Sequence, residues 1–125
     1  MAPGKADTPY DIRERSFLFG VRVIKWVRTL PRDWVTEICA KQLIRAATSV
    51  GANIEEADGT ETIKDKVYKW TTSRKEAHES RFWVRTICAA NSDSPEGLAL
   101  VQESSELINI LSTLIKKNKD TLNSD

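Results

Sequence analysis

The sequence has few of the residues from which catalytic and metal sites are built. Its 125 residues include one histidine, two cysteines and one methionine. A single histidine, His78, cannot supply a zinc site, a di-iron bundle site or a histidine-based triad without partners that the chain does not offer. Gly51 and Gly59 are isolated, so no glycine-rich phosphate loop is present. We therefore predict that the protein is not an enzyme and has no cofactor and no metal.

Long apolar runs are also missing. No run approaches the roughly 18 to 20 residues that span a bilayer, and the N-terminal stretch MAPGKADTPY lacks the apolar core of a signal peptide. We expect a cytoplasmic protein that does not bind membranes. Cys39 and Cys88 are too few and too far apart for a metal motif. They fall at different heights in a helix pair that folds back near Gly59, so no disulfide is expected.

Charge is plentiful but unevenly distributed. Charged residues make up 30% of the chain and hydrophobic ones 40%, with a net charge of +1, as in an ordinary soluble domain. Residues 60–90 hold seven basic and four acidic groups, a local charge of +3, whereas residues 91–125 hold three basic and six acidic groups, or −3. A local anionic partner is therefore compatible with a nearly neutral whole.

Turn and capping signals divide the chain into four helical segments. Pro31 ends the first segment, and Gly59 ends the second. Thr62 and Ser94 are suited to N-cap positions, and Pro95 to the first position of a helix. The predicted helices cover residues 11–29, 33–57, 60–90 and 95–119, between a loose N-terminal arm at 1–10 and a C-terminal tail at 120–125.

The apolar spacing predicts an all-α protein, an antiparallel up-and-down four-helix bundle. The last helix has one clear apolar stripe, formed by Leu100, Val101, Leu107, Ile108, Leu111, Leu114 and Ile115. The first helix has two apolar sides, and one bundle core covers only one of them. Its second side, Phe17, Val21 and Ile24, predicts contact with another subunit. The alternative is a first helix sunk deeply in its own bundle.

A polar stripe lies beside the apolar face of the second helix. Spacings of three and four residues place its members on one helical face: Gln42, Arg45, Ser49, Asn53 and Glu56. Polar groups next to a core lose water and need partners. If the third helix folds back near residue 59, Glu76 or Glu79 reaches the height of Arg45. We interpret the seven residues as a structural polar seam, and a ligand or RNA site as the alternative.

A basic stripe is predicted on the third helix. Arg74, His78, Arg81 and Arg85 recur at spacings of four, three and four, which aligns them over three turns. Such a stripe can track phosphates and makes these four residues the candidate nucleic-acid site. The alternative is a solvated helix face. The neighbouring aromatic pair, residues 82 and 83, either stacks on bases or packs in a core or interface.

Three stretches of the chain resemble a known family: YDIRERSFLFGVRVIKWVRTLP, KQLIRAATSVGANIEEADG and KEAHESRFWVR. They are similar to the four-helix-bundle proteins labelled 23S ribosomal RNA intervening-sequence proteins, over about Tyr10 to Lys117. The resemblance implies an up-and-down bundle that assembles as a homopentamer and has no established enzymatic activity. In a related branch, the accessory proteins of diversity-generating retroelements, a basic pentamer binds nucleic acid and a reverse transcriptase.

Two functions follow as hypotheses. The first is a noncatalytic, oligomeric adaptor that binds RNA, with RNA or a reverse transcriptase as partner in addition to copies of itself. The second is a protein-interaction scaffold that binds no nucleic acid. Salt-dependent RNA binding distinguishes them, because only the adaptor requires it.

Overall fold

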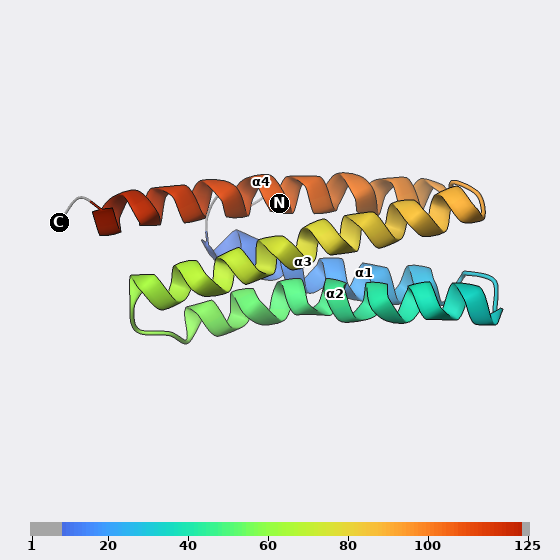
Figure 1. Cartoon of the computed structure of the whole chain (residues 1–125), viewed down its shortest axis with the longest axis horizontal. Coiled ribbons are helices and arrows are strands. Elements are labelled where there is room, and N and C mark those ends of the chain that lie inside the picture. The colour runs from blue at the N-terminus through green and yellow to red at the C-terminus, as the bar shows by residue number, and fades with distance from the viewer. Residues whose placement is uncertain (1–8, 124–125) are drawn as a thin grey trace, which may run out of the picture.

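The protein consists of four antiparallel helices (Figure 1). The structure is a computed structural model, and it describes residues 9–123. Each helix packs against two neighbours, so that α1 and α3 each contact both α2 and α4. The predicted all-α, up-and-down four-helix bundle is confirmed. The helices are α1 (Pro9–Val27), α2 (Trp34–Asp58), α3 (Ile63–Ala90) and α4 (Pro95–Asn123).

The helix starts follow the capping signals in the sequence. The Thr62 hydroxyl accepts a hydrogen bond from the backbone N–H of Asp65 at 3.0 Å, and the Ser94 hydroxyl accepts one from the N–H of Gly97 at 3.0 Å. Both predicted N-caps are therefore confirmed. Helix α2 ends at Asp58 with Gly59 as its C-cap, but this glycine has a φ of −86°, which is open to any residue.

Both chain ends are more helical than predicted. Helix α1 begins at Pro9, two residues early, because proline is well suited to the first helical position. Helix α4 continues to Asn123 and so includes residues 120–123, which were predicted as tail. No glycine or proline interrupts it there. Residues 1–8 of the predicted arm and 124–125 of the tail lie outside the described residues.

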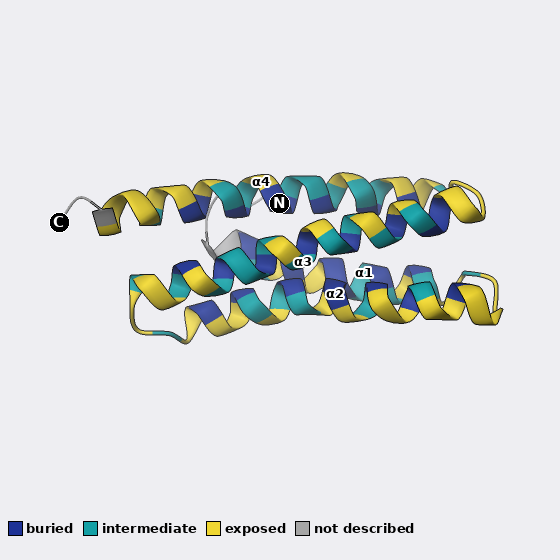
Figure 2. Cartoon of the chain, in the orientation of Figure 1, coloured by how far each residue is buried: buried dark blue, intermediate teal, exposed yellow. Residues whose placement is uncertain are grey.

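The core lies where the four apolar stripes meet (Figure 2). The stripe of α4 is buried as predicted, except that Val101 is only partly buried. Between α2 and α3 the packing is close: the Ser73 hydroxyl is fully buried and donates to the backbone carbonyl of Val50 at 2.8 Å. Cys39 and Cys88 are free thiols, in agreement with the prediction of no disulfide.

The second apolar side of α1 is left uncovered by the chain's own helices. The side chain of Phe17 is 62% exposed, while Val21 and Ile24 are half-buried. The alternative of an α1 sunk deeply in the bundle is therefore wrong. The other side of α1 supplies its core residues: Ile12, Phe19, Val23 and Trp26.

Candidate functional site

The basic stripe of α3 lies along the edge where α3 meets α4. Arg74 donates from Nη1 to the Ser112 hydroxyl at 3.2 Å, and Arg81 donates from Nη1 to the Ser105 hydroxyl at 3.1 Å. Both serines are on α4, so these two arginines extend across the helix boundary. We call this surface, formed by Arg74, His78, Arg81 and Arg85 with Ser105 and Ser112, the α3–α4 basic edge.

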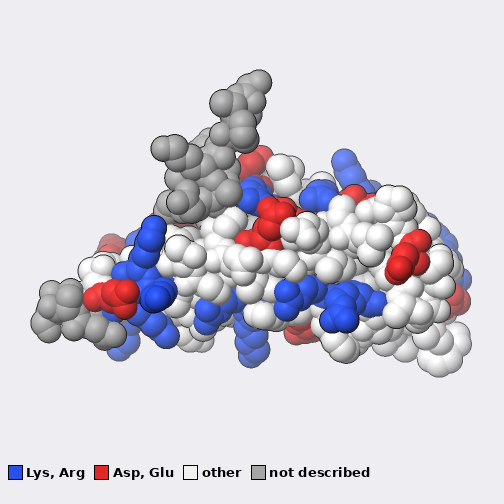
Figure 3. Space-filling model, turned by 90° about the horizontal axis from the view of Figure 1, so that it is seen from above, with Lys and Arg blue, Asp and Glu red and all other residues white. Residues whose placement is uncertain are grey.

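The partners of these arginines differ from those of other arginines. Within the described part of the chain, four arginines form ion pairs with carboxylates: Arg13, Arg15, Arg22 and Arg45. The arginines of the basic edge have neutral serine hydroxyls or solvent instead. Viewed from above α4, Lys and Arg side chains form a row along the α3 side, and the largest group of acidic side chains lies away from this row, with other basic side chains beside it (Figure 3). The positive charge of this edge is therefore locally uncompensated.

His78 adds a polar side chain rather than a charge at neutral pH. Its Nδ1 lies 3.3 Å from Nη2 of Arg81. Partial burial, followed by the nearby Arg81 and Arg74 guanidinium groups, lowers the pKa of His78 below its ordinary value of 6.5. The charge of the edge at pH 7 thus comes from its arginines.

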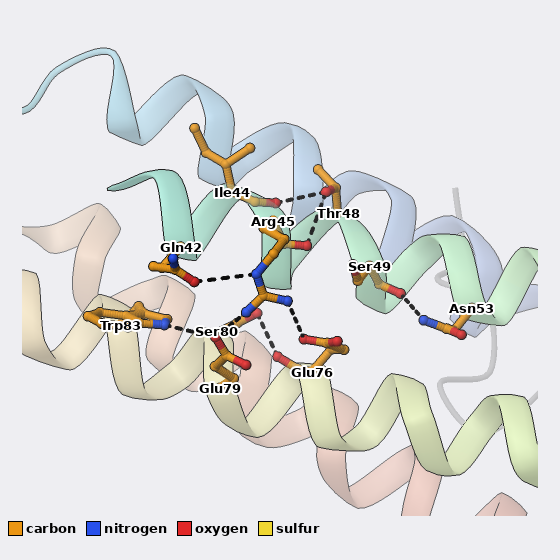
Figure 4. Close-up of polar contacts among 10 residues, drawn as sticks. All are labelled: Gln42, Ile44, Arg45, Thr48, Ser49, Asn53, Glu76, Glu79, Ser80 and Trp83. Atoms are coloured by element: carbon orange, nitrogen blue, oxygen red, sulfur yellow. Dashed lines mark hydrogen bonds and ion pairs between the residues drawn. The ribbon is translucent and has the colours of Figure 1, made fainter. Parts of the chain in front are cut away.

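Arg45 connects α2 to α3 at the polar seam (Figure 4). Its guanidinium lies 3.3 Å from Glu76 and also contacts Glu79, so both carboxylates that the sequence offered as partners contact it. The indole N–H of Trp83 donates to Glu79 at 3.0 Å. Trp83 first, and Arg45 next, lower the pKa of Glu79 below 4.5. Trp83 is thus held in place by this network.

The rest of the polar seam is less uniform than its spacing suggests. Gln42 accepts from Nε of Arg45 at 3.4 Å, and Glu56 pairs with Lys69 of α3 at 2.7 Å. Asn53, by contrast, donates to the backbone carbonyl of Ser49 at 2.8 Å and so bonds within its own helix. The seam is also open, because the Arg45 side chain is 48% exposed.

The uncovered side of α1 borders a groove against α2. Its volume is about 350 Å³, and its lining includes Phe17, Val21 and Ile24. Gly51 allows the two helices to approach, since a Cβ there would lie only 3.2 Å from the Ser16 carbonyl oxygen. The structure thus brings the three residues predicted as an oligomer interface together at one apolar groove.

The family model of the 23S rRNA-intervening sequence protein matches residues 9–116. The chain belongs to this family. A crystal structure of a protein of unknown function from the S23 ribosomal protein family of Bacteroides thetaiotaomicron has the same fold, with a TM-score of 0.79 and 26% identity over 90% of this chain and 99% of that one. A search of curated proteins finds no match. Membership in the intervening-sequence family thus brings a fold without an assigned reaction.

Metal sites and membrane-spanning helices are two further features that could give this fold a function. No group of three or more His, Cys, Asp or Glu side chains within residues 9–123 is arranged to hold a metal ion. None of the four described helices is long and apolar enough to cross a membrane.

Sequence reasoning missed several contacts of this family member. Arg15 of α1 contacts Glu103 and Glu106 of α4, at 2.6 and 2.9 Å. The serine partners on α4, Ser105 and Ser112, were not predicted either. Their spacing of seven residues, equal to that between Arg74 and Arg81, was the available signal.

Proposed function

We propose that the protein is a noncatalytic, oligomeric adaptor that binds RNA in the cytoplasm. The observation that carries this proposal is the α3–α4 basic edge, where arginines have serine partners rather than carboxylates. A guanidinium without a carboxylate keeps its charge and donors available for phosphate. The description of the family refers to 23S rRNA without stating a binding activity, so the proposal of an RNA partner depends on the basic edge.

The acids of α4 leave this edge free for phosphate. Glu103 and Glu106 turn toward α1, where Arg15 neutralises them. The α4 positions that meet the basic stripe are neutral, as at Ser105 and Ser112. An RNA backbone at this edge would therefore encounter positive charge with little opposing repulsion.

The expected result of the triple substitution R74A/R81A/R85A is weaker RNA binding with a smaller salt dependence. Each phosphate contact contributes roughly 0.7 to the magnitude of the slope of log affinity against log salt, so the loss of three contacts lowers that magnitude by about 2. Fluorescence anisotropy of a labelled RNA, titrated from about 50 to 200 mM salt, measures both quantities. The matched control is R28A/R32A/K41A, which removes the same charge from exposed positions in the α1–α2 loop and on α2.

Equal affinity and equal slope for wild type and R74A/R81A/R85A would remove the RNA proposal. Equal losses in both triple variants would indicate a general charge effect rather than a site. An intact oligomer that binds no RNA would favour the protein-interaction scaffold instead.

The oligomer in this proposal forms through the second side of α1. Phe17 is exposed at the apolar groove, and burial of such a group against another copy is favourable. A homopentamer is the assembly that the family resemblance implies. The reverse transcriptase bound in the related branch is the protein partner that this proposal extends to the chain.

The double substitution F17D/I24D is expected to separate the copies. Two carboxylates in the groove would lose water on association, and Arg13, the basic side chain in its lining, is already paired with Glu55 and Asp58. Light scattering, with and without RNA, should then give the mass of one chain, 14.1 kDa. L98D is the matched control, since Leu98 is 55% exposed on α4, away from the groove. A mass unchanged from wild type would contradict this interface.

A further inference from the structure

Two aromatic side chains are exposed on the outer face of α3. Tyr68 is 68% exposed and Phe82 is 56% exposed. They are 14 residues apart, nearly four helical turns, so they lie on one line along the helix and about 21 Å from each other. Lys75, also exposed, lies midway between them. Aromatic and basic side chains therefore alternate along this face.

One of the two rings, that of Phe82, lies next to the basic edge. Phe82 is one helical turn from both His78 and Arg85, which are exposed on the same face. Between Tyr68 and Phe82 the acids of α3 do not interrupt this surface, because Glu76 and Glu79 turn toward α2 and contact Arg45. A strand that follows the arginines thus passes beside the exposed ring of Phe82, and Tyr68 lies further along the same outer face.

The ring of Phe82 is also held in orientation. It meets the Trp83 ring edge-on, with centroids 5.0 Å apart and an interplanar angle of 75°. Trp83 is itself tied to Glu79 through its indole N–H. Trp83 is therefore a support, whereas Phe82 presents its surface to solvent. An oriented ring loses less freedom when it binds a partner.

We propose that the outer face of α3 binds single-stranded RNA, with bases stacked on Phe82 and Tyr68 and phosphates on the arginines of the basic edge. This inference rests on the proposed function and specifies its substrate class. Bases in a duplex already stack on one another, whereas a single strand offers free base faces. Alternating aromatic and basic groups suit single strands of any sequence, with sites of about 4 to 16 nucleotides.

The test uses three probes of equal phosphate number: a labelled oligoadenylate of about 12 nucleotides, an abasic strand and a hairpin duplex. Wild type is expected to bind oligoadenylate at least about tenfold more tightly than the other two probes. Y68A/F82A should bind oligoadenylate about 30-fold more weakly, from two lost stacking contacts, with its salt slope unchanged. W34A, which removes an aromatic that is 73% exposed on α2, is the matched control and should bind as wild type does.

The outcomes separate this inference from the proposed function. If R74A/R81A/R85A loses binding while Y68A/F82A binds oligoadenylate as wild type does, stacking is overturned and RNA binding stands. If wild type binds the abasic strand as tightly as oligoadenylate, stacking is overturned as well. If wild type binds none of the probes, both proposals fail. Thermal melting checks that Y68A/F82A is folded, as expected for two exposed positions.

Discussion

Replacing Gly97 with alanine is expected to destabilise the bundle by about 1 to 3 kcal/mol through overpacking. The expected sign is opposite to that of helix propensity, which favours alanine over glycine by about 1 kcal/mol. A Cβ at position 97 would lie 2.6 Å from Sγ of Cys88 and 3.0 Å from a ring carbon of Trp26. Both side chains are buried, at 5% exposure each, and come from α3 and α1. Buried side chains from two other helices would have to shift to admit one methyl group.

Urea unfolding of G97A measures this cost. G59A is the matched control, because a Cβ on Gly59 meets only the Glu56 carbonyl oxygen, at 3.6 Å. With a φ of −86° at that position, alanine should stabilise the protein by about 0.5 kcal/mol. Introducing G97A into a C88A background should reduce its cost, because the closest contact is gone. A G97A protein as stable as wild type would show that Cys88 and Trp26 can move to admit the methyl group at little cost in the free energy of unfolding.

The second large effect is expected at Arg15. Substitution by methionine leaves Glu103, whose side chain is only 16% exposed, without its partner. Removing one partner of a buried pair costs about 3 to 5 kcal/mol, and we expect about 2 kcal/mol here because Glu106 is 46% exposed and remains hydrated. The hydrogen bond to Glu103 is the main cause that raises the pKa of Arg15, so the guanidinium stays charged.

A rescue variant distinguishes charge from packing at Arg15. R15M/E103Q/E106Q removes the unpaired carboxylates and should recover most of the lost stability in urea unfolding. R22M provides the comparison, since Arg22 and Glu96 are 37% and 46% exposed and such a pair contributes under about 1 kcal/mol. If R15M costs no more than R22M, the cluster is an ordinary surface ion pair.

Local signals in the sequence explain why the helices and one cross-helix contact could be predicted. Thr62 and Ser94 act on backbone groups three residues away, so their roles do not depend on the rest of the fold. Arg45 and Glu76 lie on two helices that are joined by one short turn. Counting residues back and forward from that turn places both side chains at the same height along the helix pair. Helix α1 begins and ends two residues earlier than predicted, and α4 ends four residues later, because the positions of helix ends depend on small energy differences.

Contacts between the first and last helices were beyond that reasoning. Arg15 and Glu103 are 88 residues apart, and their contact depends on which helices become neighbours in the bundle. The same holds for Gly97, because the space available for a side chain at this position is limited by side chains from two other helices. The exposure of the aromatic side chains could not be predicted either. Phe82 and Trp83 are adjacent in sequence, yet Phe82 faces solvent and Trp83 is hydrogen-bonded to Glu79.

The square order of the helices has a consequence for assembly. Because α1 contacts α2 and α4 but not α3 within the described chain, the four helices form a square, and the α1–α2 groove and the α3–α4 basic edge lie on opposite sides of it. Copies that joined through their grooves would turn their basic edges outward, away from the axis of the assembly. A strand of RNA could then wind around the rim and pass from one protomer to the next, with each added contact made at high local concentration.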